Sequence, residues 1–176
     1  MRWLQSAKPS PHFSKTASMS VGEFRPGVRL ALDWGKARIG VAACDAEGTL
    51  CYPVETIPNT NQAVSRVRQL VAEYDPIEVI IGMPVDLQGR HSVAAETMGR
   101  IVDVLRRHLD PVPVVAVDER LTTAQASHLV IDAGVKPSKR RSVIDQQAAV
   151  HILQSTLDRQ RWNRGGGDPS TTRLVD

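Results

Sequence analysis

The chain has 176 residues, 41% hydrophobic and 23% charged, which is the size and composition of one ordinary globular domain. No apolar run approaches the roughly 20 residues that cross a bilayer, and the only two cysteines, Cys44 and Cys51, lack the paired spacing of a zinc site. We therefore expect a soluble protein with free thiols. The formal net charge of +3 and the sequence pI of about 9.1 are compatible with a nucleic acid partner.

The first 26 residues differ in composition from the rest of the chain. They are rich in Ser, Pro and basic residues, contain one acid, Glu23, and lack the apolar block of a secretory signal. We interpret residues 1–26 as a disordered N-terminal extension of a cytoplasmic protein, with Met19 as an alternative start.

The pattern from residue 28 onward predicts three strands in a meander. Val28–Trp34 is nearly all apolar, as in a strand buried on both faces, and its apolar run closes around Asp33. Arg38–Cys44 and Leu50–Ile57 are predicted as two further strands, joined by a hairpin turn at Asp45–Thr49.

Helices and strands alternate after the meander. Apolar residues at a spacing of three or four mark the helices, and short apolar runs mark the strands. Together with the meander, this alternation predicts an α/β fold over residues 27–160, with a mixed five-stranded sheet flanked by helices on both faces. The expected order is a helix at Thr60–Tyr74, a strand at Ile77–Ile81, a helix at 91–109, a strand at Val114–Val117, a helix that Thr122 or Thr123 caps and Gly134 ends, a basic loop at Lys136–Arg141, a helix from Ser142, and a flexible tail at 161–176.

Three acids stand where predicted elements begin or end: Asp33, Glu119 and Asp145. Alone, Asp33 is explained as a turn acid at a strand end and Glu119 as a salt-bridge partner of Arg120. Asp145 is equally explained as the acid of a capping box with Ser142. Together, carboxylates at buried strand ends cost free energy unless a cation compensates them, and oxygen-only ligation favours Mg²⁺ or Mn²⁺. A pair of such ions can support phosphodiester cleavage.

Two other acids compete for the place given to Glu119. Asp118 is its neighbour, but alternation along a strand sends the two side chains to opposite faces, and Glu reaches further toward a shared ion. Asp86 is a weaker rival. We therefore choose Glu119.

Four ordered motifs resemble the YqgF/RuvX family: DWGKARIGVA at residues 33–42, GMP at 82–84, DERLTT at 118–123 and DQQAA at 145–149. The resemblance covers residues 27–160 and implies an RNase H-like fold. It also implies a nuclease that matures the 5′ end of the 16S ribosomal RNA precursor, or a relative of Holliday junction resolvases, and of these we favour RNA processing. By position, it implies that Asp33, Glu119 and Asp145 are metal-binding catalytic acids for Mg²⁺ or Mn²⁺.

Basic residues near these acids are candidates for substrate binding. Arg38 either contacts a substrate phosphate or braces the acid cluster. Lys136, Lys139, Arg140 and Arg141 lie just before the helix that carries Asp145, where they would hold nucleic acid near the metal, although a solvated charge run has the same pattern. We expect a nucleic acid partner, no membrane, and a monomer or homodimer.

Two other functional classes fit part of the pattern. A strand ending in Asp-x-Gly before a hairpin also occurs in actin-like ATPases and sugar kinases, but those proteins need two such subdomains, and the length of 176 residues allows one. The second class is a non-catalytic nucleic-acid-binding scaffold that keeps the fold. The three acids argue for catalysis instead.

Overall fold

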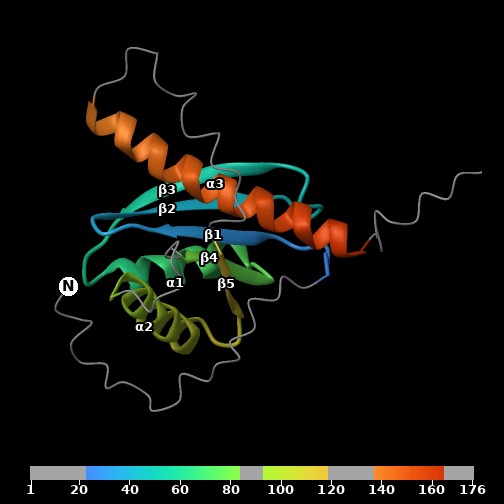
Figure 1. Cartoon of the computed structure of the whole chain (residues 1–176), viewed down its shortest axis with the longest axis horizontal. Coiled ribbons are helices and arrows are strands. Elements are labelled where there is room, and N and C mark those ends of the chain that lie inside the picture. The colour runs from blue at the N-terminus through green and yellow to red at the C-terminus, as the bar shows by residue number, and fades with distance from the viewer. Residues whose placement is uncertain (1–22, 84–92, 119–136, 165–176) are drawn as a thin grey trace, which may run out of the picture.

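The computed structural model describes residues 23–83, 93–118 and 137–164. They form a five-stranded sheet in the order β3-β2-β1-β4-β5, with α3 across one face and α1 and α2 on the other (Figure 1). None of these described helices combines the length and the apolar character needed to cross a membrane. The elements are β1 (Arg29–Trp34), β2 (Arg38–Cys44), β3 (Cys51–Pro58), α1 (Ala63–Tyr74), β4 (Glu78–Met83), α2 (Val93–Leu109), β5 (Val114–Asp118) and α3 (Pro137–Arg164).

The strand directions make this a mixed sheet, as the sequence predicted. β1 pairs antiparallel with β2, and β2 pairs antiparallel with β3, so the first three strands form the expected meander. β1 also pairs parallel with β4, which in turn pairs parallel with β5. The central strand β1 therefore has a neighbour on each side and a helical layer over each face.

Alternation along β1 divides the core into two parts. Leu30, Leu32 and Trp34 belong to the cluster that contains the buried side chains of α1 and α2. Ala31 belongs to the other cluster, with buried residues of α3. On that face β2 presents Gly40 and Ala42, both buried, so small residues let α3 pack close to the sheet.

Helix α3 differs from the prediction at both ends. It begins at Pro137 rather than at Ser142, so Lys139, Arg140 and Arg141 belong to the helix and not to a loop. Proline suits the first helical position, and the basic run that follows contains no helix breaker. Ser142 is consequently inside the helix, which rules out the capping box considered as the alternative explanation of Asp145.

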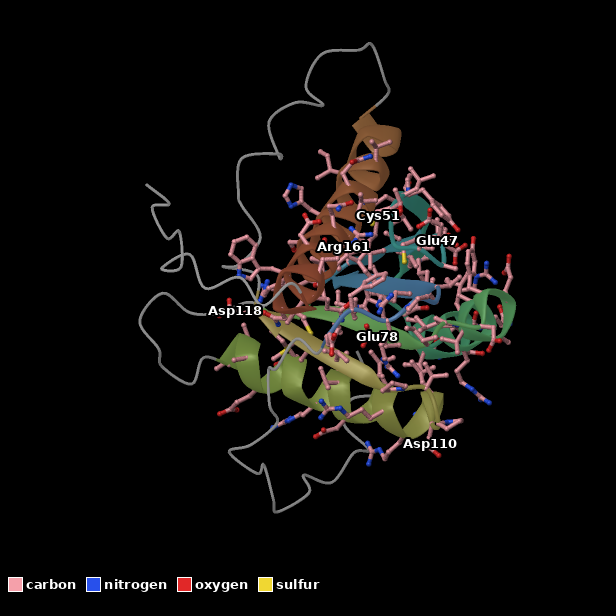
Figure 2. The ribbon with its side chains drawn as sticks, turned by 90° about the vertical axis from the view of Figure 1, so that its right-hand side faces the viewer. Glu47, Cys51, Glu78, Asp110, Asp118 and Arg161 are labelled. Carbon is pink, nitrogen blue, oxygen red and sulfur yellow. The ribbon has the colours of Figure 1, made fainter. Side chains whose placement is uncertain are left out.

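At its other end α3 continues through Arg164, beyond the expected boundary at residue 160. Arg161 donates to the backbone carbonyls of Glu47 at 2.9 Å and Gly48 at 2.6 Å, which fixes this last turn on the β2–β3 connection (Figure 2). The predicted helix between Thr122 or Thr123 and Gly134 lies outside the described residues.

A buried ion pair joins β1, β4 and the C-terminal half of α3. The Arg29 Nε donates to the Glu78 carboxylate at 2.6 Å, and Gln160 Nε2 donates to the same oxygen at 3.0 Å. The guanidinium groups of Arg29 and Arg161 both lie over the ring of Phe24, at 5.2 and 5.1 Å from its centroid. These contacts fix one end of α3 to the sheet.

Cys44 and Cys51 stand directly opposite each other in β2 and β3 and are free thiols. Burial is the main cause that raises the pKa of the Cys44 thiol, and it raises the pKa of Cys51 to about 12. Both thiols are therefore protonated near neutral pH.

Removing the acid of the buried pair should destabilise the whole fold. Glu78→Ala leaves the Arg29 guanidinium buried without its counter-ion, and we expect the free energy of unfolding to fall by about 3–5 kcal/mol in urea denaturation. Glu55→Ala is the matched control, because its pair with Arg66 is partly exposed and should cost no more than about 1 kcal/mol. Equal losses in the two variants would contradict this interpretation.

Candidate metal centre

Asp33 lies near the end of β1 on the face that α3 covers. Its neighbours Leu32 and Trp34 both pack into the opposite cluster, so alternation turns Asp33 toward α3. The side chain is only half-buried. In the β1–β2 ladder, Asp33 stands directly opposite Gly40.

Asp145 reaches the same place from α3. A Cβ built on Gly40 would collide with the backbone carbonyl group of Asp145, so the main chain of α3 touches β2 at this glycine. Residues directly opposite each other in an antiparallel pair point to the same face and have Cα atoms about 4.5–5.5 Å apart. Asp33 and Asp145 are therefore neighbours on one face, although they are far apart in the sequence.

Arg38 joins this pair of acids. It precedes Gly40 by two positions in β2, so both residues face α3. Its Nε donates to Asp145 Oδ2 at 2.7 Å, and the side chains of Arg38 and Asp145 are 38% and 26% exposed. Of the two roles considered for Arg38, the structure shows the contact with an acid.

A second polar contact lies beside the first, and the sequence did not indicate it. Gln146 Nε2 donates to the hydroxyl of Thr56 in β3 at 3.1 Å. Residues 145 and 146 of α3 are thus held by both β2 and β3. The only signal in the sequence was the Gln that follows Asp145 in the DQQAA motif.

Strand alternation places Asp118 on the other face of the sheet from Asp33 and Asp145. Along β5, Val117 packs in the cluster beside α3, whereas Ala116 packs against the opposite one, so Asp118 follows Ala116 to the other face. Figure 2 shows it where β5 ends, with Asp110 near the opposite end of that strand. Within the described ranges, no three His, Cys, Asp or Glu residues gather closely enough to hold a metal ion. The predicted third acid, Glu119, lies outside these ranges, as do its rival Asp86 and the basic Lys136.

The two acids that do come together suit a hard cation. Asp33 and Asp145 are both half-buried, and Arg38 forms an ion pair with Asp145 at 2.7 Å. Arg38 uses one oxygen of Asp145, and no described residue is recorded as a donor to the other oxygen. Carboxylate oxygens are the ligands that Mg²⁺ and Mn²⁺ prefer.

The model of the RuvX family, described as Holliday junction resolvase, matches residues 27–159, which contain all of these residues. The chain belongs to the RuvX family. It is 52% identical over 139 residues to a Streptomyces coelicolor protein named "Putative pre-16S rRNA nuclease", covering 78% of this chain and 83% of the relative. A Cutibacterium acnes protein of the same name is 46% identical over 147 residues, covering 81% and 92%.

Solved structures support the fold of this RuvX family member. Thermus thermophilus RuvC in complex with a Holliday junction substrate superposes with a TM-score of 0.52 at 15% identity, covering 76% of this chain and 96% of RuvC. A second structure of Thermus thermophilus RuvC gives a TM-score of 0.50 at 14% identity. The RNase H-like fold expected from the sequence is confirmed.

Replacing Arg38 tests whether it orients Asp145. We expect Arg38→Ala to weaken Mn²⁺ binding by about 10- to 100-fold, because the carboxylate loses its hydrogen-bond partner. The free energy of unfolding should change by no more than about 1 kcal/mol, since the pair is partly exposed. Isothermal titration with Mn²⁺ and urea denaturation measure the two effects.

Arg66→Ala is the matched control for this variant. The Arg66–Glu55 pair has the same 2.7 Å distance and similar exposures of 39% and 31%, but it joins α1 to β3 without touching either acid of the site. It should leave Mn²⁺ affinity unchanged. Tighter Mn²⁺ binding by Arg38→Ala would show instead that the guanidinium competes with the ion.

Proposed function

We propose that this RuvX family member is a metal-dependent nuclease that processes the 5′ end of the 16S ribosomal RNA precursor in the cytoplasm. The observation that carries the proposal is the contact at Gly40: this residue is the ladder partner of Asp33, and the backbone of Asp145 lies against it, with Arg38 bonded to the Asp145 carboxylate. The relatives named "Putative pre-16S rRNA nuclease", 41–52% identical to the chain, support the choice of substrate.

Asp33, Asp145 and Glu119 are the proposed ligands of Mg²⁺ or Mn²⁺. The packing of β5 turns Asp118 away from α3, which favours Glu119 as the third acid. When bound, such ions activate a water molecule and stabilise the leaving oxygen of a phosphodiester. The protein's own contribution is to hold Asp33 on the sheet and Asp145 on the helix that covers the same face.

Arg38 is also a proposed contact of the substrate phosphate. Its Nε is used by Asp145, its side chain is 38% exposed, and no described residue is recorded as a partner of its two terminal amino groups. Those groups can bind a phosphate oxygen while the Nε keeps its bond to the acid. Arg38 would then link the scissile phosphate to the carboxylate that holds the metal.

The N-terminal part of α3 is the second proposed binding site for nucleic acid. Lys139, Arg140 and Arg141 lie within about two helical turns before Asp145, and Lys136 immediately precedes the helix. A helix N-terminus also favours phosphate because its free N–H groups and its dipole face outward there. Backbone phosphates held at this end would lie next to the acids.

A branched DNA substrate is the second candidate function. The description of the family model, Holliday junction resolvase, favours it, and so does the fold shared with RuvC. Symmetric cleavage of a four-way junction needs two active sites related by a two-fold axis, so this function would call for a homodimer. Cleavage of RNA by a monomer has no such requirement.

The test is cleavage of labelled 16S precursor RNA and of a synthetic four-way junction by the purified full chain, with Mg²⁺, Mn²⁺ or EDTA. We expect RNA cleavage with either metal and none with EDTA. Asp33→Asn, Asp145→Asn and Glu119→Gln should each lower the rate by about 10³-fold, the effect of losing several kcal/mol of transition-state stabilisation. Asp158→Asn, an exposed acid further along α3, is the control and should cleave normally.

Each other outcome selects a different function. Cleavage that persists in EDTA would contradict a metal-dependent mechanism. Cleavage of the junction alone would favour the resolvase function. If Asp33→Asn supports ribosomal RNA maturation in cells while the triple variant Lys139→Ala, Arg140→Ala, Arg141→Ala does not, the protein acts as a binding scaffold.

A further inference from the structure

The contact between Gly40 and α3 involves backbone atoms rather than side chains. A Cβ on Gly40 would overlap the backbone carbonyl group of Asp145 and would lie 3.1 Å from the backbone nitrogen of Gln146. A flexible side chain could turn aside at little cost, but a helix backbone cannot. Any residue larger than glycine at this position therefore has to displace α3.

Glycine is needed at this position because of the space available, and not because of the backbone conformation. Among the described residues, the glycines with positive φ are Gly27 and Gly48, so Gly40 has a backbone conformation that other residues adopt without strain. Ala42, the next residue of β2 on the same face, carries a Cβ and is fully buried. The requirement for glycine thus arises at the level of Asp145.

The same glycine is also the direct neighbour of Asp33. The two residues are Cα partners in the β1–β2 ladder, so the Cβ position of Gly40 and the side chain of Asp33 lie on the same face. The backbone of Asp145 fills the space that a side chain at position 40 would occupy. The distance from Asp33 to Asp145 therefore depends on position 40 having no side chain.

Helix α3 has little freedom to absorb a displacement by sliding. Leu153, Leu157 and Gln160 are buried under its C-terminal half, and Gln160 bonds to the buried Glu78 at 3.0 Å. With that half fixed, a larger residue at position 40 would tilt the N-terminal half away from the sheet. Asp145 would then move away from Asp33.

We propose that Gly40 is a positioning residue, which sets the spacing at which Asp33 and Asp145 share one cation. This inference rests on the proposed metal-dependent function and adds a residue that touches neither the ion nor the substrate. A misplacement of a catalytic group by about 1 Å is enough to lower the reaction rate strongly.

Mn²⁺ binding to the full chain, followed by isothermal titration and by electron paramagnetic resonance, tests the proposal without relying on activity. We expect Gly40→Ala to bind Mn²⁺ about 10- to 100-fold more weakly than the wild type while keeping its native circular dichroism spectrum. Unchanged affinity in a folded Gly40→Ala protein would overturn the proposal and leave the proposed function intact. Failure of the wild type to bind Mn²⁺ would overturn both.

Gly48→Ala is the matched control, because it also crowds α3, but at the far end of the helix. A Cβ there would lie 2.9 Å from the Phe24 ring, 3.1 Å from the Leu157 side chain and 3.3 Å from that of Arg161, and the φ of +62° adds strain. We expect this variant to melt at a lower temperature and to bind Mn²⁺ like the wild type. Equal losses of affinity in the two glycine variants would mean that general destabilisation explains the effect, and would overturn the proposal.

Lengthening Asp145 provides a test that leaves the packing at Gly40 untouched. Asp145→Glu in the wild-type background should weaken Mn²⁺ binding by about tenfold, because the added methylene overshoots a closely spaced site. In the Gly40→Ala background the same change should strengthen binding, because the longer side chain spans the wider gap. Wild-type affinity in the single variant Asp145→Glu would overturn the proposal even if Gly40→Ala does not fold.

Discussion

The backbone of α3 touches β2 at Gly40, and the arrangement of the candidate site depends on this contact. Gly40 is the partner of Asp33 in the ladder, so this contact places Asp145 near Asp33. Arg38, two residues earlier on the same strand, then fixes the Asp145 carboxylate at 2.7 Å. One short segment of β2 thus positions a residue that is distant in the sequence.

The two ends of α3 contribute different things to this arrangement. Its C-terminal half is held by buried side chains, by the Arg29–Glu78 pair through Gln160, and by Arg161 on the β2–β3 connection. Its N-terminal half carries Asp145 and the basic run, and packs against small residues of the sheet. The fixed C-terminal half of α3 and the close contact of its N-terminal half with Gly40 together define the position of the Asp145 carboxylate in a partly exposed site.

Local pattern was enough to predict the sheet, because a strand buried on both faces and an alternating meander leave clear signals in the sequence. The predicted start of α3 was wrong because a run of basic residues is equally compatible with a loop and with an exposed helical turn. The choice of Glu119 over Asp118 followed from strand alternation. Val117 packs on the face that α3 covers, so Asp118 points to the opposite face. The contact between Gly40 and the backbone of α3 could not be predicted. It is a tertiary contact, and it depends on which backbone lies over the sheet.

The most direct test of this account is a crystal structure of the full chain grown with Mn²⁺, in which anomalous scattering locates the ion. We predict a peak about 2.1 Å from carboxylate oxygens of both Asp33 and Asp145, with Arg38 still bonded to Asp145. An ion bound elsewhere at saturating Mn²⁺, or Asp33 and Asp145 too far apart to share one, would contradict the central claim.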